Sequence, residues 1–215
     1  TKVFDNYDLA ELRDYIDWTP FFQSWDLHGT YPAILTDNVV GAAASGLFAD
    51  AQKMLDDMIS QNWLTARAVI GFWPAARDRD DLIVYENESR TKERTRFHSL
   101  RQQMQHSGTR ANFALADFIA PTNGPADYVG GFAVTTGHGE DDIAKRLEAA
   151  GDDYGSIMSK ALADRLAEAF AERMHQRVRT EFWGYAADEN LDNDSLIAEA
   201  YRGIRPAPGY PAQPD

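Results

Sequence analysis

The chain contains 215 residues, of which 34 are acidic and 21 are basic, so its formal net charge at pH 7 is −13. This balance argues against nucleic acid and anionic membrane surfaces as partners, because both attract clustered lysine and arginine. Hydrophobic residues make up 44% of the chain, enough for a packed core, and no apolar run approaches the ~18 residues of a membrane-spanning helix. The absence of cysteine excludes disulfides, thiolate metal ligands and a cysteine nucleophile. We therefore expect a cytoplasmic globular protein.

The two ends of the chain have the character of a fragment. Thr1 begins it without an initiator methionine or a secretory signal, and residues 205–215 end it in a coil with four prolines. From these features we expect a piece of a longer polypeptide whose last segment is missing.

Two short helices are predicted in the first forty residues. Leu9, Leu12 and Ile16 recur at helical spacing after a polar start. A second helix is expected to begin at Thr19 and Pro20, because threonine suits an N-cap and proline suits the first helical position. An aromatic cluster follows that is too apolar to face water and is predicted to anchor the core: Trp18, Phe21, Phe22 and Trp25.

The middle of the chain mixes a long helix with short strands. Residues 41–60 place apolar side chains on one face of a helix of about five turns. Residues 66–73 and 81–85 are β-rich runs separated by Pro74 and a charged turn, which predicts a hairpin. Residues 97–104 return to helical spacing, which predicts a helix there.

The second half is mainly helical. Residues 128–135 predict one more strand, whose paired glycines indicate a bulge or a close backbone approach. Residues 152–178 carry apolar side chains at steps of three and four and predict the longest helix. A last helix is expected to start at the capping cluster 192–195 and to run to about Tyr201. Because strands and helices mix without a regular βαβ alternation, the predicted fold class is α+β.

The sequence contains no pattern typical of a metal centre or of nucleophilic catalysis. Its five histidines form no HExxH motif. His98 and His106 are spaced so that they could lie on one face of a helix. It has no GxSxG elbow and no phosphate-binding loop. Most paired carboxylates are typical of solvated surfaces, and Glu168 and Glu172, one turn apart, follow that pattern. We predict no catalytic acid–base pair and no metal ligand.

The segment 205–210, with the sequence RPAPGY, differs from these surface patterns because its residues suit the binding of a small ligand. Its two prolines stiffen the backbone, so that little conformational entropy is lost on binding, and Gly209 allows a ligand to approach the backbone closely. Arg205 offers a planar fork suited to a carboxylate, and Tyr210 offers a flat face with a hydroxyl. The pattern indicates a clamp for a small amino-acid-like or nucleoside-like ligand, and a proline-rich linker remains the alternative.

Five blocks of sequence, in the same order, carry a resemblance to a known family. They are residues 15–22 (YIDWTPFF), 115–118 (LADF), 160–172 (KALADRLAEAFAE), 182–185 (FWGY) and 203–210 (GIRPAPGY). Through these blocks the chain resembles the C-terminal activation domain of cobalamin-dependent methionine synthase, a module that binds S-adenosylmethionine. The resemblance extends over nearly the whole chain, which we treat as one domain of residues 1–215.

The resemblance implies a C-shaped single domain of α+β class, with a twisted antiparallel sheet flanked by helices. It also implies that S-adenosylmethionine lies in a shallow groove held largely by the tail of the chain. Arg205 then binds the methionine carboxylate, the backbone around Ala207 and Gly209 lines the groove, and Tyr210 packs against the ligand.

Three acidic residues also take site positions through the resemblance. Asp17 matches the family's acidic residue near the ligand amino group, which makes it a counter-charge for an ammonium. Glu168 and Glu199 occupy positions near the site. Since the family domain continues well beyond this length, we also expect that the C-terminal part of the domain is missing and that the groove is incomplete.

The function implied by the resemblance is reductive reactivation of methionine synthase. The domain presents the methyl sulfonium of S-adenosylmethionine to cobalamin, which a neighbouring domain holds, while flavodoxin or a similar reductase supplies an electron. Two alternatives remain open. One is an interaction module that docks the reductase or the cobalamin domain without binding the ligand. The other, a free-standing methyltransferase, is disfavoured because the glycine-rich loop of a doubly wound sheet is missing.

Overall fold

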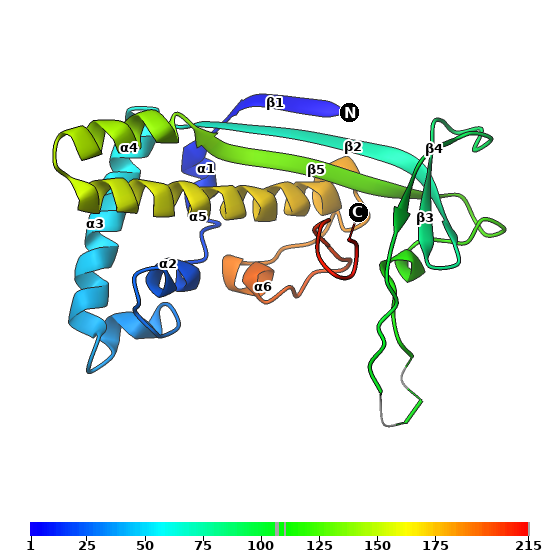
Figure 1. Cartoon of the computed structure of the whole chain (residues 1–215), viewed down its shortest axis with the longest axis horizontal. Helices are drawn as coiled ribbons and strands as arrows, with labels where there is room; N and C mark the ends of the chain where they lie inside the picture. Colours follow the sequence, from blue (N-terminus) through cyan, green and yellow to red (C-terminus); the bar gives the residue numbers. More distant parts are fainter. Residues whose placement is uncertain (106–107, 110, 215) are drawn as a thin grey trace. The chain divides into compact units, whose positions relative to one another are not determined.

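The computed structural model describes residues 1–105, 108–109 and 111–214 (Figure 1). The chain divides into two compact units. Within the described residues, the first unit comprises Thr1–Lys2, Ile70–Phe132 and Gly203–Asp215, and the second comprises Val3–Val69 and Ala133–Arg202. The tail of the chain therefore belongs to a different unit from most of its helices.

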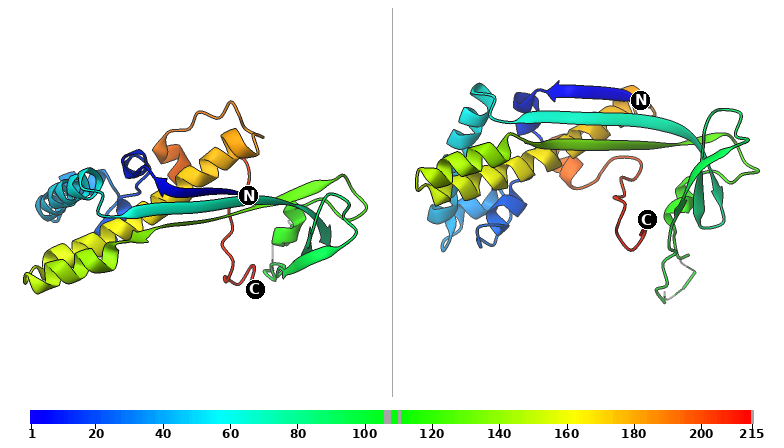
Figure 2. Two further views of the ribbon diagram at one scale, coloured as in Figure 1. Left: turned by 90° about the horizontal axis from the view of Figure 1, so that it is seen from above. Right: turned by 45° about the horizontal axis from the view of Figure 1, so that its top comes forward.

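Five strands form one antiparallel sheet: β1 (Lys2–Tyr7), β2 (Thr65–Asp78), β3 (Asp81–Tyr85), β4 (Glu93–His98) and β5 (Asp127–His138). Their order is β1-β2-β3-β4, and β5 also pairs with β2. Figure 2 shows β2 and β5 as two long ribbons side by side. The prediction of an α+β fold with an antiparallel sheet and flanking helices is confirmed.

The second unit is built around one long helix. Its helices are α1 (Leu9–Arg13), α2 (Thr19–Gln23), α3 (Gly41–Ser60), α4 (Glu140–Ala149), α5 (Asp153–Arg177) and α6 (Asn193–Ile197), with a 3-10 helix at Ala33–Thr36 and a π-helix at Val178–Phe182. α5 contacts α1, α2, α3 and α4, and runs alongside α4 in Figure 1. None of the helices in the described ranges is both long and apolar enough to cross a membrane.

The core of this unit follows from the spacing of apolar residues on α5. Met158, Leu162, Leu166, Phe170 and Met174 recur every four residues, and each is fully buried. This spacing places them on one helix face. The predicted helix over residues 152–178 is therefore confirmed to within a residue at each end, as is the predicted helix over residues 41–60.

Aspartates begin three of these helices. The side chains of Asp8, Asp152 and Asp192 accept hydrogen bonds from the backbone N–H groups of α1, α5 and α6. Each bond satisfies a helix donor that has no partner within the helix. The expected N-cap role of Thr19 is wrong, because Thr19 is the first residue of α2 and its hydroxyl accepts a bond from the Tyr31 N–H.

The first unit contains a three-stranded meander. β2 pairs with β3 from Ala75 to Asp78, and β3 pairs with β4. The predicted hairpin is confirmed, because β2 and β3 pair antiparallel. The expected break at Pro74 is wrong, since β2 continues through Pro74 to Asp78 and only the charged turn separates the two strands. Pro74 precedes the first residue that pairs with β3, so its missing N–H costs no bond to that strand.

Two further predictions about elements are wrong, and one strand was not predicted. The helix expected at residues 97–104 is absent, because Phe97 belongs to β4 and pairs with Leu82, so tertiary pairing overrides local helical spacing. The strand β1 at Lys2–Tyr7 had no counterpart in the sequence analysis. The last helix ends at Ile197 instead of Tyr201, because Glu199 takes a left-handed backbone conformation with φ 54°.

Candidate functional site

The residues predicted to form the site belong to both units. We call the three acidic ones in the second unit the acidic group: Asp17, Glu168 and Glu199. We call residues 203–214 of the first unit the tail, which carries the other four: Arg205, Ala207, Gly209 and Tyr210.

Asp17 occupies the junction between α1 and α2. Its Oδ1 accepts the N–H of Thr19 at 3.0 Å, which orients the carboxylate at the start of α2 and uses one of its two oxygens. The next residue, Trp18, is buried and meets the rings of Phe21 and Phe48 edge-on, with centroids 5.3 and 4.9 Å apart. The predicted aromatic anchor is confirmed here, and it gives the half-buried Asp17 a rigid support.

Glu168 and Glu199 are both exposed. Glu168 lies in the middle of α5, and Glu199 follows the end of α6. The Ala200 N–H donates to the Ser195 carbonyl at 3.0 Å and so ends α6. In helix ends of this type, the position that Glu199 occupies here is usually a glycine. A hydrogen bond of 3.4 Å from Asn193 Nδ2 to the Ile16 carbonyl joins the start of α6 to the residue before Asp17.

The tail forms a tight turn. The Gly209 N–H donates to the Gln213 carbonyl at 2.8 Å, and the Gln213 N–H donates to the Tyr210 carbonyl at 2.9 Å. Gly209 has φ 88°, a conformation that glycine adopts without strain, although a Cβ there would meet no atom within 4 Å. Glycine is therefore required here by the backbone angle and not by lack of space.

The turn is attached to the rest of its unit. The Leu100 N–H donates to the Ala212 carbonyl at 3.0 Å, so the tail is bonded to the segment that follows β4. Within this turn Tyr210 is 66% exposed and presents its ring to solvent, while Arg205, earlier in the tail, is half-buried. An attached turn of this kind differs from a linker that leaves the domain.

A buried ion pair precedes the tail, and sequence reasoning missed it. Arg179 is fully buried and donates through Nε and both terminal nitrogens: to the carboxylate of Glu189 at 2.7–3.2 Å and to Nδ1 of His175 at 2.8 Å. Its guanidinium lies 4.0 Å from the centroid of the Tyr201 ring. The signal available in the sequence was the spacing of His175 and Arg179, one helical turn apart.

This pair positions the last residues of the second unit. Tyr201 stacks on Arg179 and meets His175 edge-on, with ring centroids 4.8 Å apart. The Tyr185 hydroxyl donates to the Arg202 carbonyl at 3.1 Å, and burial raises the pKa of Tyr185, which keeps this donor protonated. The residues immediately before the tail are thus held by the buried Arg179 and His175 and by the hydroxyl of Tyr185.

A shallow pocket of about 310 Å³ lies in the second unit, lined by residues of α1, α5 and the α6 region. The lining residues are Glu11, Asp14, Tyr15, Arg173, Leu191, Asn193 and Leu196. Inside it Arg173 pairs with Glu11 at 2.6 Å and lies 5.4 Å from the centre of the Tyr15 ring. None of the predicted site residues lines this pocket.

The histidines give no metal site within the described ranges. His98 lies on β4, where its Nδ1 is 3.0 Å from Asp81 Oδ1, so the expectation of a helix that His98 shares with His106 is wrong. His106 itself lies outside the described residues. Among the residues that are described, no group of three or more His, Asp or Glu side chains is arranged to hold a metal ion.

The sequence model of the family described as "Vitamin B12 dependent methionine synthase, activation domain" matches residues 8–215. The chain belongs to this family. The resemblance carried by the five sequence blocks is therefore confirmed.

A solved structure of a related protein agrees. The crystal structure described as the MetH reactivation domain bound to AdoHcy is 54% identical in sequence, with a TM-score of 0.93. The match covers 99% of this chain and 65% of that one, so the chain spans about two thirds of the length of this activation-domain relative.

Proposed function

We propose that this activation domain binds S-adenosylmethionine and presents its methyl group to cobalamin held by a neighbouring domain of methionine synthase. The observation that carries the proposal is the 54% identical relative bound to AdoHcy, which is S-adenosylmethionine without its transferable methyl group. Family membership over residues 8–215 supports the same function.

The charges of the predicted residues suit this ligand. Its methionine part carries one carboxylate and one ammonium, and its sulfonium is a second cation. Arg205 is assigned to the carboxylate, since a guanidinium binds carboxylates through two parallel hydrogen bonds. Asp17 is assigned to the ammonium, and Glu168 and Glu199 add negative charge where a cationic ligand benefits from it.

The tail is assigned to the rest of the ligand. Its turn exposes the Tyr210 ring, a flat surface against which the ligand can pack, and the left-handed Gly209 leaves the backbone beside it without a side chain. The backbone at Ala207 is assigned to the wall of the groove. Because the turn is already formed, little conformational entropy is lost when the ligand binds.

The reaction balances with one added electron. Cobalamin bound by its own domain would accept the methyl group once flavodoxin or a similar reductase had supplied one electron, and S-adenosylhomocysteine would leave with the bonding electron pair on its sulfur. The cofactors supply the reactivity, and the protein supplies binding and orientation. This chain therefore needs no acid–base pair of its own for the transfer.

Calorimetric titration of the chain with S-adenosylmethionine tests the proposal. We expect saturable binding, and we expect Arg205→Ala to weaken it by about 1.5–3 kcal/mol, through loss of a charge-assisted bidentate contact. Arg202→Ala is the matched control, because Arg202 is an exposed arginine three residues away, and it should bind as the unaltered chain does.

Each other outcome has a distinct meaning. If the chain released no heat with S-adenosylmethionine or S-adenosylhomocysteine, the result would favour the alternative of an interaction module without a ligand. Equal affinities of the Arg205→Ala variant and the unaltered chain would leave the function standing and remove Arg205 from the site.

A further inference from the structure

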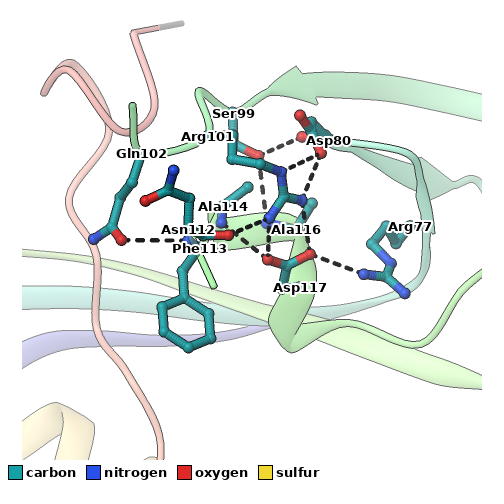
Figure 3. A network of polar contacts seen from close by, with 10 residues as sticks. All are labelled: Arg77, Asp80, Ser99, Arg101, Gln102, Asn112, Phe113, Ala114, Ala116 and Asp117. Carbon is teal, nitrogen blue, oxygen red and sulfur yellow. Dashed lines mark hydrogen bonds and ion pairs between the residues drawn. The ribbon is translucent and has the colours of Figure 1, made fainter. Parts of the chain in front are cut away.

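The tail is bonded to Leu100, and the residues on both sides of Leu100 are held by a polar network in the first unit (Figure 3). On one side, the Ser99 hydroxyl donates to the Asp80 carbonyl and accepts the N–H of Ala116 at 3.3 Å. Ser99 itself is buried. On the other side stands Arg101, which is the centre of the network.

Arg101 uses all five of its N–H donors. Nε and Nη2 donate to Asp80 Oδ1 at 3.1 and 2.6 Å, and Nη2 and Nη1 donate to the two carboxylate oxygens of Asp117 at 2.9 and 2.7 Å. The fifth bond, at 2.7 Å, runs from Nη1 to the Asn112 carbonyl. One side chain thus joins the turn after β2, the segment after β4 and the 3-10 helix at Leu115–Phe118.

Asp117 is fixed from several directions. Besides Arg101 it accepts bonds from Arg77 at 2.8 Å and from the Ala114 N–H at 3.0 Å. The contacts with Arg101, followed by the bond from Ala114, hold the pKa of the Asp117 carboxyl far below its ordinary value of 3.8. The Asp117 carboxyl therefore stays charged at neutral pH and keeps accepting these bonds.

From this geometry we infer that Arg101 is a positioning residue for the ligand-binding tail. It fixes the segment 99–102, so that the Leu100 N–H is held at the place where it binds the Ala212 carbonyl and supports the turn that carries Gly209 and Tyr210. The inference rests on the proposed function, because it gives the attached tail its role in binding S-adenosylmethionine.

The size of the effect follows from the population of the attached tail. A ligand that needs the tail in place binds more weakly in proportion to the fraction of molecules in which the tail is attached. If loss of the network leaves the tail attached in about a tenth of the molecules, the apparent Kd rises about tenfold. Arg101→Lys should lie near Arg101→Gln, because an ammonium cannot span two carboxylates and a carbonyl in the geometry of a guanidinium.

The test compares Arg101→Gln with Arg96→Gln. Arg96 lies on β4 of the same unit and bonds three carboxylates, those of Glu93, Asp78 and Asp81, but makes no bond to the segment 99–118 or to the tail among the described residues. Its side chain is 27% exposed, close to the 35% of Arg101. The two substitutions therefore remove networks of comparable size. Of the two, only the Arg101 network includes the segment that is bonded to the tail.

Two measurements are made on each variant: amide hydrogen exchange at Leu100, Gly209 and Gln213, and the Kd for S-adenosylmethionine. We expect Arg101→Gln to speed exchange at these amides at least tenfold and to raise the Kd about tenfold, with Arg96→Gln within twofold of the unaltered chain in both. Should Arg101→Gln fail to fold, Asp80→Asn, which keeps the Asp117 contacts, is measured in its place and should show the same effects at smaller size.

Unchanged exchange in the Arg101 variant would overturn the inference, as would equal changes in the Arg101 and Arg96 variants. Faster exchange with an unchanged Kd would show that Arg101 holds the tail without serving the ligand, which also overturns it. If the unaltered chain does not bind S-adenosylmethionine, the proposed function fails and the inference about the ligand fails with it, while the exchange data still decide whether Arg101 holds the tail.

Discussion

Replacing Glu189 with glutamine removes the counter-charge of the fully buried Arg179. The Glu189 side chain is 7% exposed and binds the guanidinium through both carboxylate oxygens at 2.7–3.2 Å. Glutamine keeps the shape and one acceptor, but its amide nitrogen then faces a donor of the guanidinium. His175 and the Tyr201 ring remain beside Arg179, and neither supplies a negative charge to replace the lost one.

The expected cost is large because the charge left behind is buried. Removing one partner of a buried ion pair typically costs about 3–5 kcal/mol. A domain is usually stable by about 5–15 kcal/mol, so this one substitution removes a substantial share. Replacing both residues with apolar ones, as in Arg179→Met with Glu189→Leu, should cost much less, since no unpaired charge remains.

Urea unfolding followed by tryptophan fluorescence measures this cost. With a slope of about 3 kcal/mol per molar urea, a loss of 3 kcal/mol lowers the midpoint by about 1 M. Asp56→Asn is the control: Asp56 pairs with Arg13 at the surface and is 64% exposed, so its loss should cost less than about 1 kcal/mol. If Glu189→Gln cost no more than this control, the reasoning about the buried pair would be refuted.

Two further predictions concern single residues. Glu199→Gly should raise the free energy of unfolding by up to about 1 kcal/mol, because glycine adopts φ 54° without strain, whereas Glu199→Ala should not raise it. If Glu199 serves the site, both variants should bind S-adenosylmethionine more weakly in a titration. The lowered pKa of Asp117 stabilises the fold fully above pH 3.8, and this contribution is lost as the pH falls below 3.8 toward the folded-state value. Asp117→Asn should therefore be less stable than the unaltered chain at pH 6 and should lose less stability between pH 4 and pH 2. Unfolding measured at each pH tests this. Parallel curves of unfolding free energy against pH for the two proteins would contradict it.

Local patterns in the sequence predicted the long elements well. The four-residue spacing on α5 and the apolar face of α3 need only local geometry, and the capping aspartate before α6 works within three residues. The prediction of a helix at residues 97–104 was wrong because the structure of this segment depends on a distant part of the chain. Phe97 has helical spacing to its neighbours, but its place is decided by Leu82, which lies on a strand 15 residues earlier.

In the candidate site, too, local features could be predicted from the sequence and long-range contacts could not. The residue types of the tail indicated a clamp, and the resemblance to the family supplied the acidic group. The contacts made by the tail, by its neighbours and by the residues before it could not be predicted, because they join positions far apart in the sequence: Arg101 with Asp80, Leu100 with Ala212, and Tyr201 with Arg179. Their partners lie 21 to 112 positions apart, and a single sequence carries no signal for such pairs.

A crystal structure of this chain with S-adenosylhomocysteine bound tests the central proposal most directly. We predict that the ligand carboxylate lies about 3 Å from the Arg205 guanidinium and that its ammonium lies within hydrogen-bonding distance of the Asp17 carboxylate. A ligand found elsewhere on the chain, or bound with neither of these two groups in contact, would contradict the account.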